Sequence, residues 1–128
     1  MRKKIYYRCV FDYGSHKDSI SYEELGSYDW QNDHHVIRFS TQDGVMVLKY
    51  NDEEVFLTHD ASHLMFAINQ LIENEYQSDQ GSIPLKTEIQ SLDGDEHRLK
   101  LIYMLYQGDQ IVTHAYMMVR MEDLDADA

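Results

Sequence analysis

The chain has 128 residues and a mass of 15.2 kDa, enough for one domain with a single hydrophobic core. Its 23 Asp and Glu against 11 Lys and Arg give a formal net charge of -12, which repels phosphate groups, so we expect neither nucleic acid nor an anionic membrane as a partner. A single cysteine, Cys9, excludes an intrachain disulfide, and no apolar run approaches the roughly 18–20 residues of a membrane-spanning helix. The basic start lacks the apolar core and cleavage site of a signal peptide, so we expect a cytoplasmic protein.

The first half of the chain alternates apolar and polar residues between turn signals, which predicts successive antiparallel strands. The first strand covers residues 4–12, with Ile5, Tyr7 and Cys9 on one face. A more polar strand follows over residues 20–25, with a bend or bulge at Gly26. Further strands are predicted over residues 35–40, 45–50 and 54–58, and Asp43-Gly44 is one of the turns between them.

Residues 62–73 fit two patterns. Leu64, Ile68 and Leu71 fall at helical spacing behind a possible N-cap, Ser62. The same residues also alternate as a strand, and their position between other strands favours the extended form. Beyond Gly81, alternation resumes over residues 82–92, where Pro84 indicates an edge or a strand start because it cannot donate a backbone hydrogen bond.

The last two apolar runs, residues 98–106 and 110–121, form a hairpin hinged at Gly108-Asp109. A two-residue turn places Gln107 opposite Gln110 and Tyr103 opposite His114. Both faces of this hairpin are then apolar, so both must be buried against other parts of the protein or against a partner. One face holds Leu99, Leu101, Tyr103, Leu105, Val112, His114, Tyr116 and Met118, and the other holds Ile102, Met104, Tyr106, Ile111, Thr113, Ala115, Met117 and Val119.

These elements predict an all-β fold, an antiparallel meander of about eight to ten strands that closes into a barrel, because open sheet edges aggregate. The first and last strands should lie side by side. We expect one barrel domain over residues 1–121 and a disordered acidic tail over residues 122–128, which contain too little apolar surface to order themselves.

The segment Glu75-Tyr76-Gln77-Ser78-Asp79-Gln80-Gly81-Ser82-Ile83-Pro84-Leu85-Lys86-Thr87 resembles the signature of the YwiB-like family, bacterial proteins of unknown function. Tyr76, Ser78 and Gly81 match the family pattern, and Gln80 stands where the family has an aromatic residue. The likeness covers nearly the whole chain, including the basic first strand and the two strands around Gly108. It implies a lipocalin-like, or calycin-like, barrel with residues 62–72 as a strand, and it implies no activity.

The best candidate for chemistry is the group of Tyr103, His114 and Tyr116, because an imidazole between phenols can shuttle a proton or bind a polar ligand head. A core histidine paired with a tyrosine hydroxyl is the alternative. Tyr7 and Tyr76 are further candidates for ligand contacts. Cys9 lies on an apolar face and is predicted to be a core residue.

Metal and cofactor chemistry find little support in the sequence. His59 and His63 would share a metal ion only on a helix, and on a strand that geometry fails. The neighbours His34 and His35 point to opposite faces of a strand. There is no motif for a phosphate loop or an activated nucleophile, so we expect no cofactor and no metal.

The sequence therefore predicts non-catalytic binding of a small, partly apolar molecule in the barrel mouth. One alternative is an interaction module that uses the outer face of the terminal hairpin, and another is an enzyme that uses His114 with Tyr103 or Tyr116. Because a barrel interior covers only one face of that hairpin, we also expect a homodimer that buries the other.

Overall fold

The computed structural model describes residues 1–124, which form ten antiparallel strands and no helix. None of the described residues therefore belongs to a helix long and apolar enough to cross a membrane. The strands are β1 (Arg2–Asp12), β2 (Lys17–Gln31), β3 (His34–Thr41), β4 (Gly44–Tyr50), β5 (Glu54–His59), β6 (Ser62–Ala67), β7 (Leu71–Ser78), β8 (Gly81–Gly94), β9 (Arg98–Gln107) and β10 (Gln110–Asp123). The predicted all-β antiparallel fold is confirmed.

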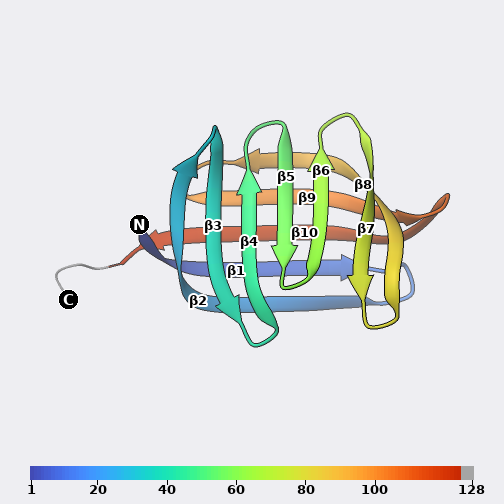
Figure 1. Cartoon of the computed structure of the whole chain (residues 1–128), viewed down its shortest axis with the longest axis horizontal. Coiled ribbons are helices and arrows are strands. Elements are labelled where there is room, and N and C mark those ends of the chain that lie inside the picture. The colour runs from blue at the N-terminus through green and yellow to red at the C-terminus, as the bar shows by residue number, and fades with distance from the viewer. Residues whose placement is uncertain (125–128) are drawn as a thin grey trace.

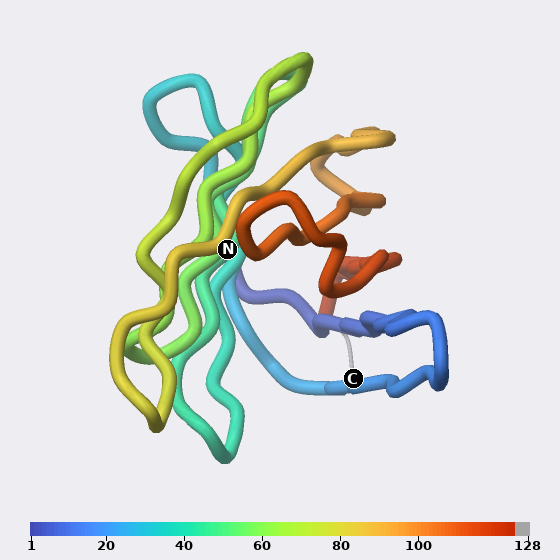
Figure 2. The backbone as a smooth tube through the Cα atoms, turned by 90° about the vertical axis from the view of Figure 1, so that its right-hand side faces the viewer, coloured from blue at the N-terminus to red at the C-terminus, as the bar shows by residue number. Residues whose placement is uncertain are grey.

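The strands form one sheet in the order β6-β5-β4-β3-β2-β1-β10-β9-β8-β7. The first and last strands are neighbours as predicted, with Cys9 opposite Met117. The sheet curls into a nearly closed barrel of two layers, in which β1, β2, β9 and β10 run across β3 to β7 (Figure 1). Figure 2 shows the two layers from the side.

The predicted bend in the second strand is present at Gly26, where β2 passes from one layer to the other (Figure 1). Gly26 lies opposite Lys3 of β1 and also opposite Phe39 of β3. A Cβ atom at this position would lie 2.3 Å from the carbonyl oxygen of Arg38. Glycine is therefore required here because the two layers approach too closely for a side chain.

Side chains close the seam between β6 and β7, the end strands of the sheet, which share no backbone ladder in the described part of the chain. The Met65 N–H donates to Oδ1 of Asn74 at 2.8 Å, and the Asn74 amide donates to the Met65 carbonyl at 3.2 Å. The Thr87 hydroxyl donates to the same carbonyl at 2.5 Å, and Ser62 donates to the Gln77 carbonyl at 3.0 Å. These bonds satisfy edge groups that would otherwise be open to pairing with another chain.

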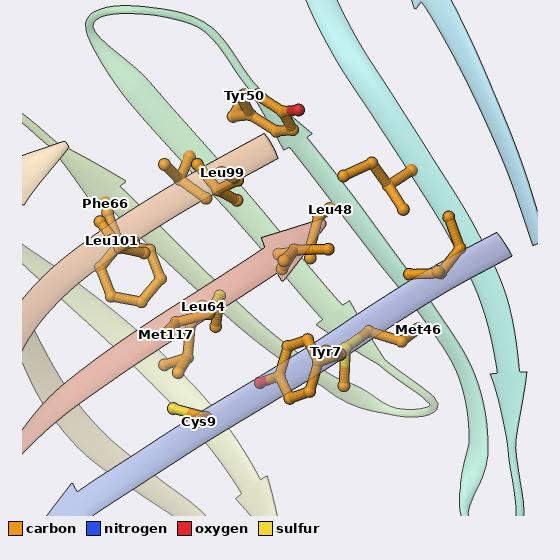
Figure 3. Close-up of a cluster of buried hydrophobic side chains, with 14 of the residues drawn as sticks. Tyr7, Cys9, Met46, Leu48, Tyr50, Leu64, Phe66, Leu99, Leu101 and Met117 are labelled. Atoms are coloured by element: carbon orange, nitrogen blue, oxygen red, sulfur yellow. The ribbon is translucent and has the colours of Figure 1, made fainter. Parts of the chain in front are cut away.

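Large side chains from both layers meet in a core between them (Figure 3). Ile5, Leu48, Leu101 and Met117 are fully buried there. Cys9 is also fully buried, and burial raises the pKa of its thiol to about 11. It is the core residue that the sequence predicted, since the thiolate form needed for nucleophilic chemistry is disfavoured.

Two predicted boundaries are wrong. Residues 62–72 were expected to form one strand, but the chain turns at Ile68, Asn69 and Gln70, where Asn69 has φ 60°, and continues as a second strand. The last strand also extends to Asp123, because Lys3 of β1 pairs with it in the ladder and through its ammonium group. Residues 125–128 of the expected disordered tail lie outside the described residues.

The predicted register of the terminal hairpin holds at its turn, where Gln107 lies opposite Gln110, and fails beyond Val112. A β-bulge between Ile111 and Thr113 shifts the pairing by one residue, so Tyr103 lies opposite Ala115 rather than His114. Because strand side chains alternate between faces, the bulge reverses the faces of the rest of β10. Ala115, Met117 and Val119 consequently point into the core, and His114, Tyr116 and Met118 point outward.

Candidate functional site

The barrel contains a cavity of about 760 Å³ at the end where β4 begins and β5 ends. Its wall is mainly aromatic and aliphatic, and none of the residues that line it is Lys or Arg. The wall is formed by Tyr7, Phe11, Tyr13, Asp18, Ser19, Ile20, Tyr22, Asp43, Met46, Leu57, His59, Ser62, Leu64, Tyr76, Leu85, Tyr103, Leu105, Val112 and Thr113. A cavity of this size accommodates a small organic molecule.

The inner part of the cavity is built from buried side chains of both layers. Tyr7 of β1 and Tyr103 of β9 come from one layer, and Met46 of β4 and Leu64 of β6 come from the other. Burial raises the pKa of Tyr7 and of Tyr103 well above the ordinary value of 10.0. Both phenols, like ordinary tyrosines, are protonated at neutral pH, and each also forms a hydrogen bond with the Cys9 thiol. A phenol can donate to a bound molecule in place of the thiol.

The outer part of the cavity carries hydrogen-bond acceptors. The Thr41 hydroxyl donates to the Gly44 carbonyl at 2.9 Å, so its oxygen accepts the 2.9 Å bond from Nε2 of His59. This arrangement assigns the proton of a neutral His59 to Nε2 and leaves Nδ1 as an acceptor. Asp18 and Asp43 line the same region, and Oδ2 of Asp18 lies 3.8 Å from Nε2 of His16. The mouth of the cavity therefore suits a neutral donor or a cation better than an anion.

Packed aromatic side chains fill the other end of the barrel, where β4 ends. The Tyr28 hydroxyl and Nδ1 of His35 form a 2.6 Å hydrogen bond, and the His35 ring stacks on Tyr50 with 4.9 Å between ring centroids. The Tyr50 hydroxyl in turn donates to the Asp95 carbonyl at 2.7 Å.

Three of the five predicted ligand contacts, Tyr7, Tyr76 and Tyr103, line the cavity. The other two do not, because the bulge at Val112 turns His114 and Tyr116 to the outer surface. They remain neighbours there, with the Tyr116 hydroxyl 3.3 Å from Nδ1 of His114. The predicted grouping of Tyr103 with these two residues is therefore wrong.

The sequence interpretation missed Tyr22 and the polar residues of the mouth. Alternation could have placed Ile20 and Tyr22 on the inner face of the second strand, but that strand is too polar to show clearly which face is buried. The sequence predicts that His59 and His63 are polar turn residues rather than metal ligands, yet His59 faces the cavity while His63 pairs with Thr58 on the outer surface. The residues that the structure describes contain no group of three or more potential metal ligands.

A family model described as a domain of unknown function (DUF1934) matches residues 5–119. The chain belongs to this family. The crystal structure of the ywiB protein from Bacillus subtilis is similar to this chain, with a TM-score of 0.79 and 17% sequence identity over 97% of this chain and 92% of that chain. The resemblance to the YwiB-like family is thus confirmed, and a search of curated proteins finds no match.

Membership of DUF1934 supports the barrel and supplies no activity. At 17% identity, the likeness to the Bacillus subtilis protein concerns the fold alone. The function of this member of the family has to be argued from the size, lining and polarity of its cavity.

Proposed function

We propose that this protein binds one small, partly apolar molecule in the barrel cavity without transforming it, and that the molecule carries a neutral or cationic donor group at its polar end. One observation carries this proposal: a cavity of about 760 Å³ lined by aromatic and aliphatic residues and by no Lys or Arg. Known ligand pockets occupy roughly 300–1,000 Å³ and combine an apolar wall with a few polar groups.

The polarity of the ligand follows from the two ends of the cavity. The carboxylates of Asp18 and Asp43 and Nδ1 of His59 would repel or fail to bond an anionic head, such as the carboxylate of a fatty acid. The same three groups accept hydrogen bonds from an amine or a hydroxyl. Deeper in the cavity, Tyr7 and Tyr103 donate to an acceptor on the ligand.

Binding is favoured over catalysis by the positions of the reactive groups. The enzyme alternative combined His114 with Tyr103, and these side chains lie on opposite faces of the sheet. The remaining pair, His114 and Tyr116, lies outside the cavity. The Cys9 thiol, whose pKa is raised to about 11, is a poor nucleophile at neutral pH.

A cytoplasmic location remains our proposal, in keeping with a single, unpaired and buried cysteine.

The proposal can be tested by titrating the protein with two fluorescent dyes, neutral Nile red and anionic 1-anilinonaphthalene-8-sulfonate. Nile red should bind with one site per chain and more tightly than the anionic dye. Leu57→Trp places an indole in the cavity and should weaken Nile red binding at least about tenfold.

The matched control is Leu25→Trp, which makes the same exchange at a position that is 54% exposed on the opposite side of the sheet. It should leave the affinity for Nile red unchanged. Equal loss of affinity in both variants, or tighter binding of the anionic dye, would contradict the proposal.

A further inference from the structure

The outer face of β1, β10 and β9 carries a second hollow, which we call the basic groove. Its volume is about 760 Å³, and its outward-facing wall includes Tyr6, Arg8, Arg98, Lys100, Met118 and Arg120. The ladders place these side chains in two adjacent rows: Tyr6 is opposite Arg120, which is opposite Arg98, and Arg8 is opposite Met118, which is opposite Lys100. Four cations therefore share a small area of one sheet face, and two carboxylate residues flank them, Glu23 opposite Tyr6 and Asp93 opposite Lys100.

This concentration of positive charge is unexpected in a chain with a formal net charge of -12 and only 11 Lys and Arg. Within residues 1–124, no carboxylate lies within 4.0 Å of a side-chain nitrogen of Arg8, Arg98 or Lys100. Arg120 has only Glu122, at 3.3 Å. The four cations outnumber the two carboxylates of the wall, and neighbouring like charges repel each other, so a bound anion would reduce the repulsion in the groove.

Tyr6, the outward-facing aromatic residue of the groove, does not offer a free surface for a nucleobase. The Tyr6 ring is half-buried, and its centroid lies 4.5 Å from Cζ of Arg120 and 5.5 Å from Nζ of Lys4. Proteins that bind single-stranded nucleic acid stack bases on open aromatic rings. The cations of the groove therefore point to an anion that needs no stacking, such as a carboxylate.

Apolar surface continues from the cations along the same strands. Met118 is 59% exposed and Tyr116 is 40% exposed, and Ile102 lies beside Tyr116 in the ladder. All three strands have hydrogen-bonded neighbours on both sides, so a partner cannot add to the sheet as a further strand at this face. It has to bind through its side chains, with acidic groups and apolar groups side by side.

We propose that the basic groove binds an extended peptide segment of another protein in which Asp or Glu alternates with apolar residues. Its carboxylates pair with Arg8, Arg98 and Arg120, whose planar guanidinium groups form two parallel hydrogen bonds with a carboxylate. Its apolar side chains cover Met118 and Tyr116. The cations of the groove lie on the opposite face of the strands from the cavity, and Tyr7 and Tyr22 line both hollows.

The test uses a fluorescein-labelled synthetic peptide in which Asp-Leu-Glu-Ala is repeated three times, and a matched peptide with Asn and Gln in place of Asp and Glu. Fluorescence anisotropy should show binding of the acidic peptide, loss of binding as salt is raised, and no binding of the amide peptide. The double variant Arg8→Glu with Arg98→Glu should weaken binding by at least about tenfold, and Lys100→Glu should weaken it less.

The control is Arg38→Glu, which reverses an exposed charge on β3 in the other layer and should leave binding unchanged. Far-UV circular dichroism checks that each variant keeps its strand signal. Equal binding of the two peptides, or equal affinity of the double variant and the wild type, overturns the proposal. It is also overturned if a thymidine oligonucleotide competes better than the acidic peptide, or if the double variant dissociates a dimer of the wild type, since a second copy then occupies the groove.

Discussion

At the scale of single residues, the inner wall of the barrel contains three groups whose neutral, protonated form is favoured by burial. Cys9, Tyr7 and Tyr103 face the interior, and burial raises the pKa of each. In the unfolded chain the thiol ionises near 9.0 and the phenols near 10.0. The folded protein holds these protons to higher pH, so unfolding in alkaline solution releases protons.

The free energy of unfolding should therefore fall as the pH rises above about 9. Below that value, the stabilisation that these buried groups contribute is fully present. For Cys9, whose pKa rises from 9.0 to about 11, the loss is on the order of 3 kcal/mol at most. Urea unfolding at pH 7, 9 and 10.5 measures this decline. Cys9→Ala should make the decline between pH 9 and 10.5 shallower, and an equally steep decline in that variant would show that the thiol plays no part.

Asn74 contributes two of the hydrogen bonds that close the barrel. Its amide satisfies both the N–H and the carbonyl of Met65 across the seam between β6 and β7. Asn74→Ala should lower the free energy of unfolding by about 1–3 kcal/mol, because it removes the partner of a half-buried backbone N–H. Urea unfolding measures the loss, and hydrogen exchange at the Met65 amide should become faster.

The control for this variant is Gln77→Ala, an exposed position on the same strand whose side chain makes no hydrogen bond within the described residues. It should change stability by less than about 0.5 kcal/mol. The role of Asn74 is refuted if Asn74→Ala changes the free energy of unfolding as little as Gln77→Ala does.

At the scale of elements, the bulge at Val112 decides which residues of β10 face the core. Deleting Val112 removes the extra residue and leaves Thr113 opposite Leu105, so Ala115, Met117 and Val119 should still face the core. We therefore expect the deletion variant to fold, as circular dichroism and thermal unfolding can show. Val112→Ala keeps the bulge and is the matched control. A deletion variant that loses the folded state while Val112→Ala keeps it would contradict this account of the register.

The sequence allowed the strands to be predicted where one face is clearly apolar, as in β1, where Ile5, Tyr7 and Cys9 alternate with more polar residues. It could not reveal the bulge, because Ile111-Val112-Thr113 contains no glycine and both faces of β10 look alike. The turn after β6 could not be predicted from the sequence either, because Ile68 and Leu71 continue the apolar pattern across it. The full set of residues in the cavity wall could not be predicted from the sequence, because the wall combines residues from nine strands.

At the scale of the whole molecule, the corrected register changes the surface on which the predicted dimer depends. Met117 and Val119 are buried, so the outer apolar area beyond the basic groove contains Met104, Tyr106 and Ile111. The dimer remains a prediction, to be checked by light scattering at micromolar concentration. Ile111 is 58% exposed, and Ile111→Lys should give a monomer. A wild-type protein that is monomeric at every concentration would contradict the prediction.

The molecule thus presents two sites of opposite character on the two faces of one group of strands. The cavity has an acidic, acceptor-rich mouth and an apolar interior, and the basic groove is open and cationic. The two proposed sites place different demands on their ligands. The central claim concerns the cavity.

Native mass spectrometry of the protein purified from its own host tests that claim most directly. We expect a reproducible additional mass of one small, neutral or cationic molecule per chain, which is released on denaturation. It should be present in Leu25→Trp and absent from Leu57→Trp, because only the second variant fills the cavity. A bare chain mass in the wild type, or the same additional mass in both variants, would contradict the account.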